Sequence, residues 1–148
     1  MREILFRGKR TDNGEWVEGI LFNAKEDIFI IPHGNEYSYD PIEGLAFDVY
    51  GCKVDPETVG QYTGLTDKNG VRIFEGDICG FKRFNDFHVG KIVFNVKTAS
   101  FIMWYQLIVG AYGEKATQKM LLSVCDDIEV IGNIHDNPDI LKGGEENG

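Results

Sequence analysis

The chain has 148 residues, a net charge of −9 and an apolar fraction of 43%. This length suffices for one ordinary domain or two small ones with an apolar core, and the composition is globular rather than disordered. The acidic total argues against nucleic acid as a partner, because a phosphate backbone repels a negatively charged protein. Ten Phe, six Tyr and eighteen Gly favour strands and tight turns over long helices.

The three cysteines, Cys52, Cys79 and Cys125, fit neither a disulfide framework nor a zinc module. Unpaired cysteines are typical of a reducing cytoplasm. The opening MREILFRGKR lacks the apolar segment of an export signal, and no apolar run approaches membrane-spanning length. We therefore expect a soluble cytoplasmic protein with no membrane contact.

The first part of the chain predicts an N-terminal β subdomain over residues 1–55. Two apolar stretches, EILFRG and EWVEGILF, flank the polar KRTDNG, which ends in an Asn-Gly turn signal. DIFIIP predicts a third strand, which ends at Pro32 because proline lacks the donor of a strand ladder. Arg7, Lys9 and Arg10 form the local basic cluster that any nucleic-acid binding would need, although a solvated turn also explains it.

Residues 56–142 predict a second, mainly β unit. A strand at Thr58–Tyr62 would meet VRIF through the turn TDKNG, and EGD would then redirect the chain into ICGFKRF. HVGKIVFN, SFIMWYQLIVG and DIEVIGNIH predict further strands, whereas AYGEKATQK is only loosely patterned. The sequence EGDIC, followed later by GKIVFN, is similar to the opening of small SH3-like barrels. We therefore expect a partly open barrel of that kind, which is an analogy of fold and not of function.

The end of the chain predicts one short helix and a tail. In DNPDIL, Asn137 is placed to cap a helix and Pro138 to occupy its first position. Residues 143–148 are acidic and glycine-rich, which is typical of a flexible tail.

The middle of the chain also holds the residues that we expect to determine the fold through turns. Glycine adopts positive φ without steric cost, so a cluster of glycines between strands indicates bends rather than chemistry. The predicted structural turn residues are Gly60, Gly64, Gly70, Gly76 and Asp77.

Candidate catalytic and metal sites find little support in the sequence. An EF-hand loop starting at Asp67 would put Arg72 where glycine is required and Ile78 where glutamate is required, so a hairpin turn explains this stretch better. Glu75 and Asp77 would share a face of a strand and could serve a small hydrolase, but Gly76 between them indicates a turn. The histidines, His33, His88 and His135, share no metal-ligand spacing. We predict no catalytic, cofactor-binding or metal-binding residue.

The run FIMWYQLIV, Phe101–Val109, is apolar on both faces of a strand. An antiparallel strand with one wet face alternates apolar and polar residues, so both faces of this strand should be covered. One face can fill the core, and the other must meet the N-terminal subdomain or another copy of the chain. Ile102, Trp104 and Ile108 are therefore the candidate interface, and we expect a homo-oligomer.

Three stretches of the chain together resemble the YopX family of phage and prophage proteins. They are VDPETVGQYTGLTDKNGVRIFEGDI, the opening MREILFRGKRTDNGEWVEG and the closing IEVIGNIHDNPDIL. Cys79 departs from the pattern, since similar sequences tend to have Val or Ile there, and this supports a core role for it.

The resemblance implies a function only in outline. The family has no established activity, so it implies no catalytic residue and no cofactor. It implies a phage or prophage protein in the bacterial cytoplasm. We therefore expect a non-enzymatic accessory protein that acts by binding, as a homo-oligomer or with a phage or host protein. The alternatives are an acidic adaptor that contacts nucleic-acid-handling proteins or nucleic acid itself, and a small hydrolase that uses Glu75 and Asp77.

Overall fold

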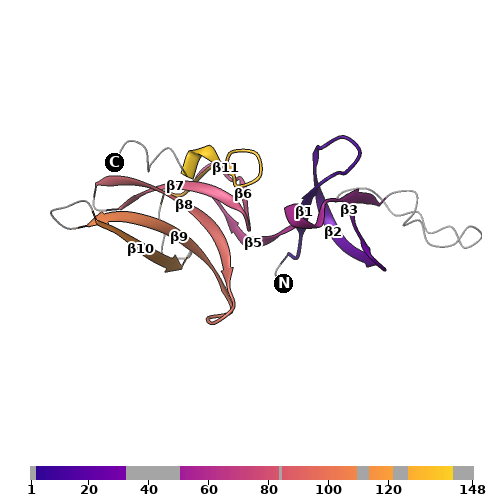
Figure 1. Cartoon of the computed structure of the whole chain (residues 1–148), viewed down its shortest axis with the longest axis horizontal. Coiled ribbons are helices and arrows are strands. Elements are labelled where there is room, and N and C mark those ends of the chain that lie inside the picture. The colour runs from indigo at the N-terminus through magenta and orange to yellow at the C-terminus, as the bar shows by residue number, and fades with distance from the viewer. Residues whose placement is uncertain (1–2, 33–50, 84, 110–113, 122–126, 142–148) are drawn as a thin grey trace, which may run out of the picture. The chain divides into compact units, whose positions relative to one another are not determined.

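The structure, a computed structural model, describes residues 3–32, 51–83, 85–109, 114–121 and 127–141 (Figure 1). At residues 83, 106–109 and 114–121 it describes the backbone alone. The predicted tail, His33 and Cys125 lie outside the described residues. The chain is mainly β, with antiparallel sheets and one short helix near the C-terminus, which confirms the predicted fold class.

The chain divides into two compact units, Met1–Tyr62 and Thr63–Gly148. The sequence placed the division between residues 55 and 56. The elements of the first unit are β1 (Phe6–Lys9), β2 (Trp16–Ala24), β3 (Asp27–Pro32), β4 (Cys52–Val54), the 3-10 turn η1 (Pro56–Thr58) and the start of β5 (Gly60–Thr66). The second unit holds the rest of β5, β6 (Arg72–Phe74), β7 (Asp77–Arg83), β8 (Asp86–Asn95), β9 (Ser100–Val109), β10 (Glu114–Leu121), β11 (Glu129–Asn133) and a helical turn at residues 139–141.

The first sheet has the order β4-β3-β2-β1-β5-β6, of which β4 to the start of β5 belong to the first unit. This part of the sheet curls so that β4 returns to the end of β1. The Asp55 N–H donates to the Lys9 carbonyl at 2.9 Å, and the Thr11 N–H donates to the Lys53 carbonyl at 3.0 Å. The curl brings β1 so close to β4 that a Cβ on Gly8 would lie 3.0 Å from the Cβ of Val54. Only glycine fits this crossing without displacing its neighbour.

The first unit differs from the sequence prediction at the start of β5. The predicted strand began at Thr58, but this residue lies in η1, and β5 starts at Gly60. The cause is a local cap: the Asp55 carboxylate accepts from the Glu57 N–H at 3.1 Å, and Pro56 supplies a fixed φ at the first position.

The larger sheet of the second unit has the order β10-β9-β8-β7-β11. Four strands follow one another as a meander, and β11 then returns beside β7, the first of them. A last strand beside the first is the arrangement expected of an SH3-like unit. The sheet does not close on itself, because β10 and β11 are its two edges. The loosely patterned segment of the sequence supplies the edge strand β10.

The core of the second unit lies on one face of this sheet. Phe81 meets Tyr105 edge to face, with ring centroids 4.9 Å apart. Cys79 is fully buried among these side chains, which is the core role expected of it. The whole cluster consists of Ile73, Cys79, Phe81, Ile92, Met103, Tyr105 and Ile128. In the part of the chain that the structure describes, no helix is long and apolar enough to cross a membrane.

Candidate functional site

The Glu75-Gly76-Asp77 turn joins four strands of the second unit. Gly76 has a φ of +91°; its N–H donates to the Ile92 carbonyl at 2.9 Å, and its carbonyl accepts from the Ile134 N–H at 2.9 Å. Asp77 is buried, and its Oδ2 accepts from the Phe74 N–H at 2.7 Å. The turn therefore ties β6 and β7 to β8 and to the end of β11.

This geometry gives no support to Glu75 and Asp77 as a catalytic pair. Asp77 is only 1% exposed, and its carboxylate holds the backbone of the turn. Glu75 is half-buried one residue before the glycine. The hydrogen bond from the Phe74 N–H gives the Asp77 carboxylate a structural role. No catalytic role is needed to explain an acidic residue at this position.

The other predicted turn glycines differ in their roles. Gly64 and Gly70 have φ values of +89° and +82°, in the left-handed region that favours glycine. Gly64 nevertheless lies within β5. Gly60 lies within the same strand, opposite Arg7 in the register of β1 and β5. It is a strand residue and makes no turn.

Asp67 holds the β5–β6 turn and also reaches a distant strand. Its Oδ1 accepts from the N–H groups of Asn69 and Val71, at 2.8 and 2.9 Å, and its Oδ2 accepts from the Val130 N–H at 3.0 Å. Burial alone would raise the pKa of Asp67, but the hydrogen bonds from Val130, Val71 and Asn69 outweigh it and lower the pKa below its usual value.

The contacts of Asp67 are those of a structural residue and not of a calcium ligand. Sequence reasoning identified the turn but missed the bond to β11, because nothing local indicates a partner 63 residues away. Within the described ranges, no group of three or more His, Cys, Asp or Glu side chains is placed to hold a metal ion.

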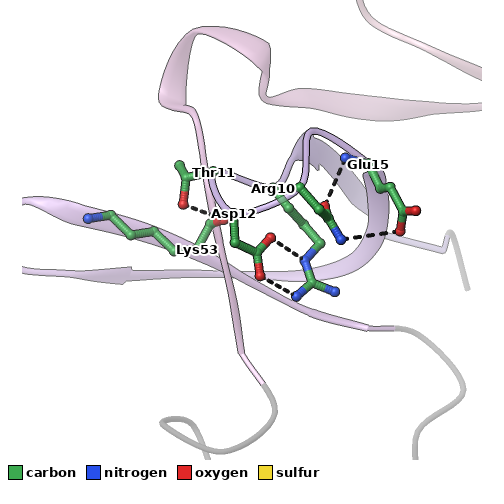
Figure 2. Close-up of polar contacts among 6 residues, drawn as sticks. Arg10, Thr11, Asp12, Glu15 and Lys53 are labelled. Carbon is green, nitrogen blue, oxygen red and sulfur yellow. Dashed lines mark hydrogen bonds and ion pairs between the residues drawn. The ribbon is translucent and has the colours of Figure 1, made fainter.

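The predicted basic cluster lies on the β1–β2 hairpin, where Arg10 is already paired. Figure 2 shows its guanidinium forked onto the Asp12 carboxylate, with Nε–Oδ1 and Nη2–Oδ2 distances of 2.9 and 2.6 Å. This hydrogen bonding raises the pKa of Arg10 and lowers that of Asp12. The neighbouring Glu15 is also fixed within the turn, since its N–H donates to the side chain of Asn13 at 2.9 Å.

Arg7 and Lys9 both lie over the ring of Trp16. The Arg7 Cζ is 4.8 Å and the Lys9 Nζ 5.6 Å from the ring centroid, which are cation–π distances. Glu18 is opposite Arg7 in the register. The structure thus places all three predicted basic residues on one hairpin. Each of them already interacts with another side chain of the same protein.

The candidate interface on β9 is partly covered by its own chain. Ile102 is 4% exposed and Trp104 is half-buried, with the Lys91 Nζ 4.7 Å from the centroid of its ring. The side chain of Ile108 lies outside what the structure describes. An interface at this face stays a prediction, and Trp104 rather than Ile102 would have to carry it.

An exposed apolar surface lies instead at the end of the β8–β9 hairpin, which extends beyond the other strands of its sheet (Figure 1). Val96 is 82% and Phe94 43% exposed, and Phe94 meets Phe101 edge to face at 5.2 Å. We call Phe94, Val96 and Phe101 the apolar tip. Sequence reasoning missed it because Val96 belongs to a turn, where periodicity carries no signal.

Comparisons with known proteins agree with this architecture. The sequence matches the YopX protein family over residues 5–142. The crystal structure of protein EF1440 from Enterococcus faecalis is similar to the chain, with 26% identity and a TM-score of 0.51, over 95% of this chain and 99% of that one. No curated protein matches the sequence. Because the family match spans nearly the whole chain and includes both β units, the chain belongs to the YopX protein family.

Proposed function

We propose that this protein is a non-enzymatic accessory protein of phage or prophage origin that acts by binding, and that it self-associates. Its place in the YopX family supports the phage association. The observation that supports binding is the apolar tip, in which Val96 and Phe94 are exposed and Phe101 is partly buried beside them. The cytoplasm of the bacterial host is the compartment in which we expect it to act.

The apolar tip has the properties of a contact surface. Burying one large apolar side chain contributes about 1.5–3 kcal/mol, so a second copy that covers Val96 and Phe94 would gain several kcal/mol. Apolar patches on an otherwise polar surface commonly mark interfaces. The adjoining turn is well formed rather than frayed, since the Asn95 side chain accepts from the Lys97 N–H at 3.1 Å.

The hydrolase alternative is less well supported, because Asp77 has a structural task. A second copy of the chain is the occupant that we propose for the tip, and a phage or host protein is the competing one. A competing partner would leave the purified protein monomeric.

Sedimentation equilibrium of the purified protein and one variant tests self-association. Val96→Asp places a charge at the most exposed apolar position of the tip, and we expect it to dissociate the oligomer without unfolding it. Ile4→Asp is the matched control, since Ile4 is also exposed, at 57%, but lies in the other unit. It should leave the oligomer intact.

Two results would contradict the proposal. A wild-type protein that stays monomeric at high concentration would show that the tip binds no second copy. Dissociation by Trp104→Asp but not by Val96→Asp would move the interface to the β9 face predicted from the sequence.

A further inference from the structure

The register of the five-stranded sheet gathers lysines on the face opposite the core cluster. Lys82 is opposite Phe87 on β7 and β8, and Lys91 is opposite Trp104 on β8 and β9. We call these four residues the lysine face. The neighbouring residues along each strand, such as Phe81 and Ile92, belong to the core cluster on the other side.

Strand β10 extends the same pattern by its position in the register. Lys119 is opposite Trp104, and Lys115 precedes it by four residues, so both positions are on the same face of the sheet. Along the described strands β7 to β10, the register puts no Asp or Glu on this face. In a chain with a net charge of −9, this face therefore has lysine and no acid at the charged positions of β7 to β10.

On β11, the register puts one acidic residue on this face, Glu129, which is opposite Gly80. Its carboxylate already has a basic partner, because the Lys68 Nζ lies 3.5 Å from its Oε2. Glu129 therefore offsets little of the charge of the lysine face.

The aromatic ring of Phe87 lies against the sheet, and a glycine makes this possible. A Cβ on Gly80 would lie 2.5 Å from the ring Cζ and 2.9 Å from Cε2, so the ring covers the backbone of Gly80. Phe87 is nevertheless 62% exposed, which leaves much of its surface open. The result is an aromatic platform held by the backbone beneath it, with Lys82 directly opposite on the next strand.

Trp104 adds a second ring to the same face. It is half-buried, and the Lys91 Nζ lies 4.7 Å from its ring centroid. Phe87 is the exposed ring of this face, and Trp104 is the partly covered one. An exposed ring beside lysines is an arrangement that binds single-stranded nucleic acid, where bases stack on the ring and ammonium groups neutralise phosphates.

We propose that the lysine face binds single-stranded nucleic acid without sequence preference. This rests on the proposed binding function and names a partner for it. Single strands fit better than a duplex, because a ring can stack only on an unpaired base. An acidic peptide would satisfy the lysines but would leave the ring of Phe87 without a flat partner.

The net charge of the chain limits the affinity but does not prevent contact. At physiological ionic strength, charges more than about 8 Å from a phosphate are largely screened, so the nearby lysines dominate the local interaction. Binding should therefore be measurable at low salt and should weaken steeply as salt is added.

Fluorescence anisotropy of a labelled oligothymidylate of about 20 nucleotides tests the stacking platform. We expect Phe87→Ala to weaken binding by roughly 5- to 150-fold, the range for loss of one stacked base. Ile20→Ala is the control, because Ile20 is also a large exposed apolar residue, at 49%, but lies on β2 in the other unit and outside the apolar tip. It should leave the affinity unchanged.

The salt dependence tests the lysines separately. The double variant Lys82→Gln/Lys91→Gln should reduce the slope of log affinity against log salt by about 1.4, from two phosphate contacts at about 0.7 each. Lys25→Gln/Lys97→Gln removes the same charge from two exposed turns and should leave the slope unchanged.

The proposal is overturned if the wild-type protein does not bind the oligonucleotide at about 50 mM salt. An equal reduction of the salt slope in the two double variants would also overturn it, since the slope would then depend only on the total charge of the protein. Equal competition by a duplex of the same length would exclude stacking. If the lysine-face variants instead dissociate an oligomer, the face binds protein. Val96→Asp reports on self-association independently, so failure here is distinct from failure of the proposed function.

Discussion

At the scale of single residues, Gly76 offers the sharpest test of the fold. A Cβ at this position would lie 3.7 Å from the nearest atom, the His135 Nε2, so there is space for a side chain. The φ of +91° is the obstacle, because a β-branched residue is strained there. We expect Gly76→Val to lower the free energy of unfolding by about 1–3 kcal/mol, measured by chemical denaturation.

The control for this variant is its neighbour. Glu75→Gln should change stability by less than about 0.5 kcal/mol, the usual range for a surface substitution. A Gly76→Val protein that unfolds like the wild type would show that the turn relaxes without cost. The sequence could predict Gly70 and Gly76 as turn residues because turn chemistry is local, whereas Gly64 lies within β5 with a positive φ. It could not assign Gly60, whose place in a strand depends on pairing with β1.

At the scale of elements, Asp67 joins the β5–β6 turn to β11. Asp67→Asn would place an NH2 group against the N–H of either Val130 or the turn, so one buried donor would lose its acceptor. We expect a loss of about 1–3 kcal/mol at neutral pH, measured from urea unfolding curves.

The pH dependence of this difference follows from the lowered pKa of Asp67. The stabilisation by the carboxylate is complete above the unfolded pKa of about 3.9 and is lost as pH falls through the lower folded pKa. The gap between wild type and Asp67→Asn should therefore be constant near neutrality and shrink below about pH 4. Asp86→Asn, at the exposed start of β8, is the control. A gap that does not change down to pH 2 would contradict the assignment.

The strands themselves differ in how well the sequence predicts them. β3 follows the predicted DIFIIP from end to end, because an apolar run ended by proline is a strong local signal. β10 gave only a loose pattern, since an edge strand with polar residues such as Lys115 and Lys119 lacks the apolar alternation of a central strand. The lysine face could not be predicted from the sequence for a related reason. Its residues come from different strands, and only the register of these strands shows that they share a face.

At the scale of the whole molecule, each unit has its own buried core. Ile30 is fully buried in the first unit and Ile92 in the second. Truncation of a buried Ile to Ala costs about 2–5 kcal/mol. Ile92→Ala should therefore accelerate amide hydrogen exchange more in β7–β9 than in β1–β3, and Ile30→Ala should do the reverse. Equal acceleration in both units by either variant would show that the chain unfolds as one cooperative body.

The net charge of the chain does not show how charged residues are distributed over its surface. A net charge of −9 argued against nucleic acid and drew attention to Arg7, Lys9 and Arg10 as the one local exception. The structure engages those residues with Trp16 and Asp12 and gathers other lysines on the second sheet. Charge summed along a chain says little about charge on a face, because strand pairing brings distant residues together.

Along β8, successive residues lie alternately on the core face and on the lysine face. This alternation tolerates substitutions better than it tolerates insertions or deletions. Lys91 is on the lysine face and Ile92 is in the core, so inserting or deleting one residue between Asp86 and Asn95 would exchange the two faces. Ammonium groups would then enter the core, at a cost that no single substitution on the surface approaches. Changes in length can therefore accumulate at the β8–β9 turn, while the strands that flank it can diverge only by substitution.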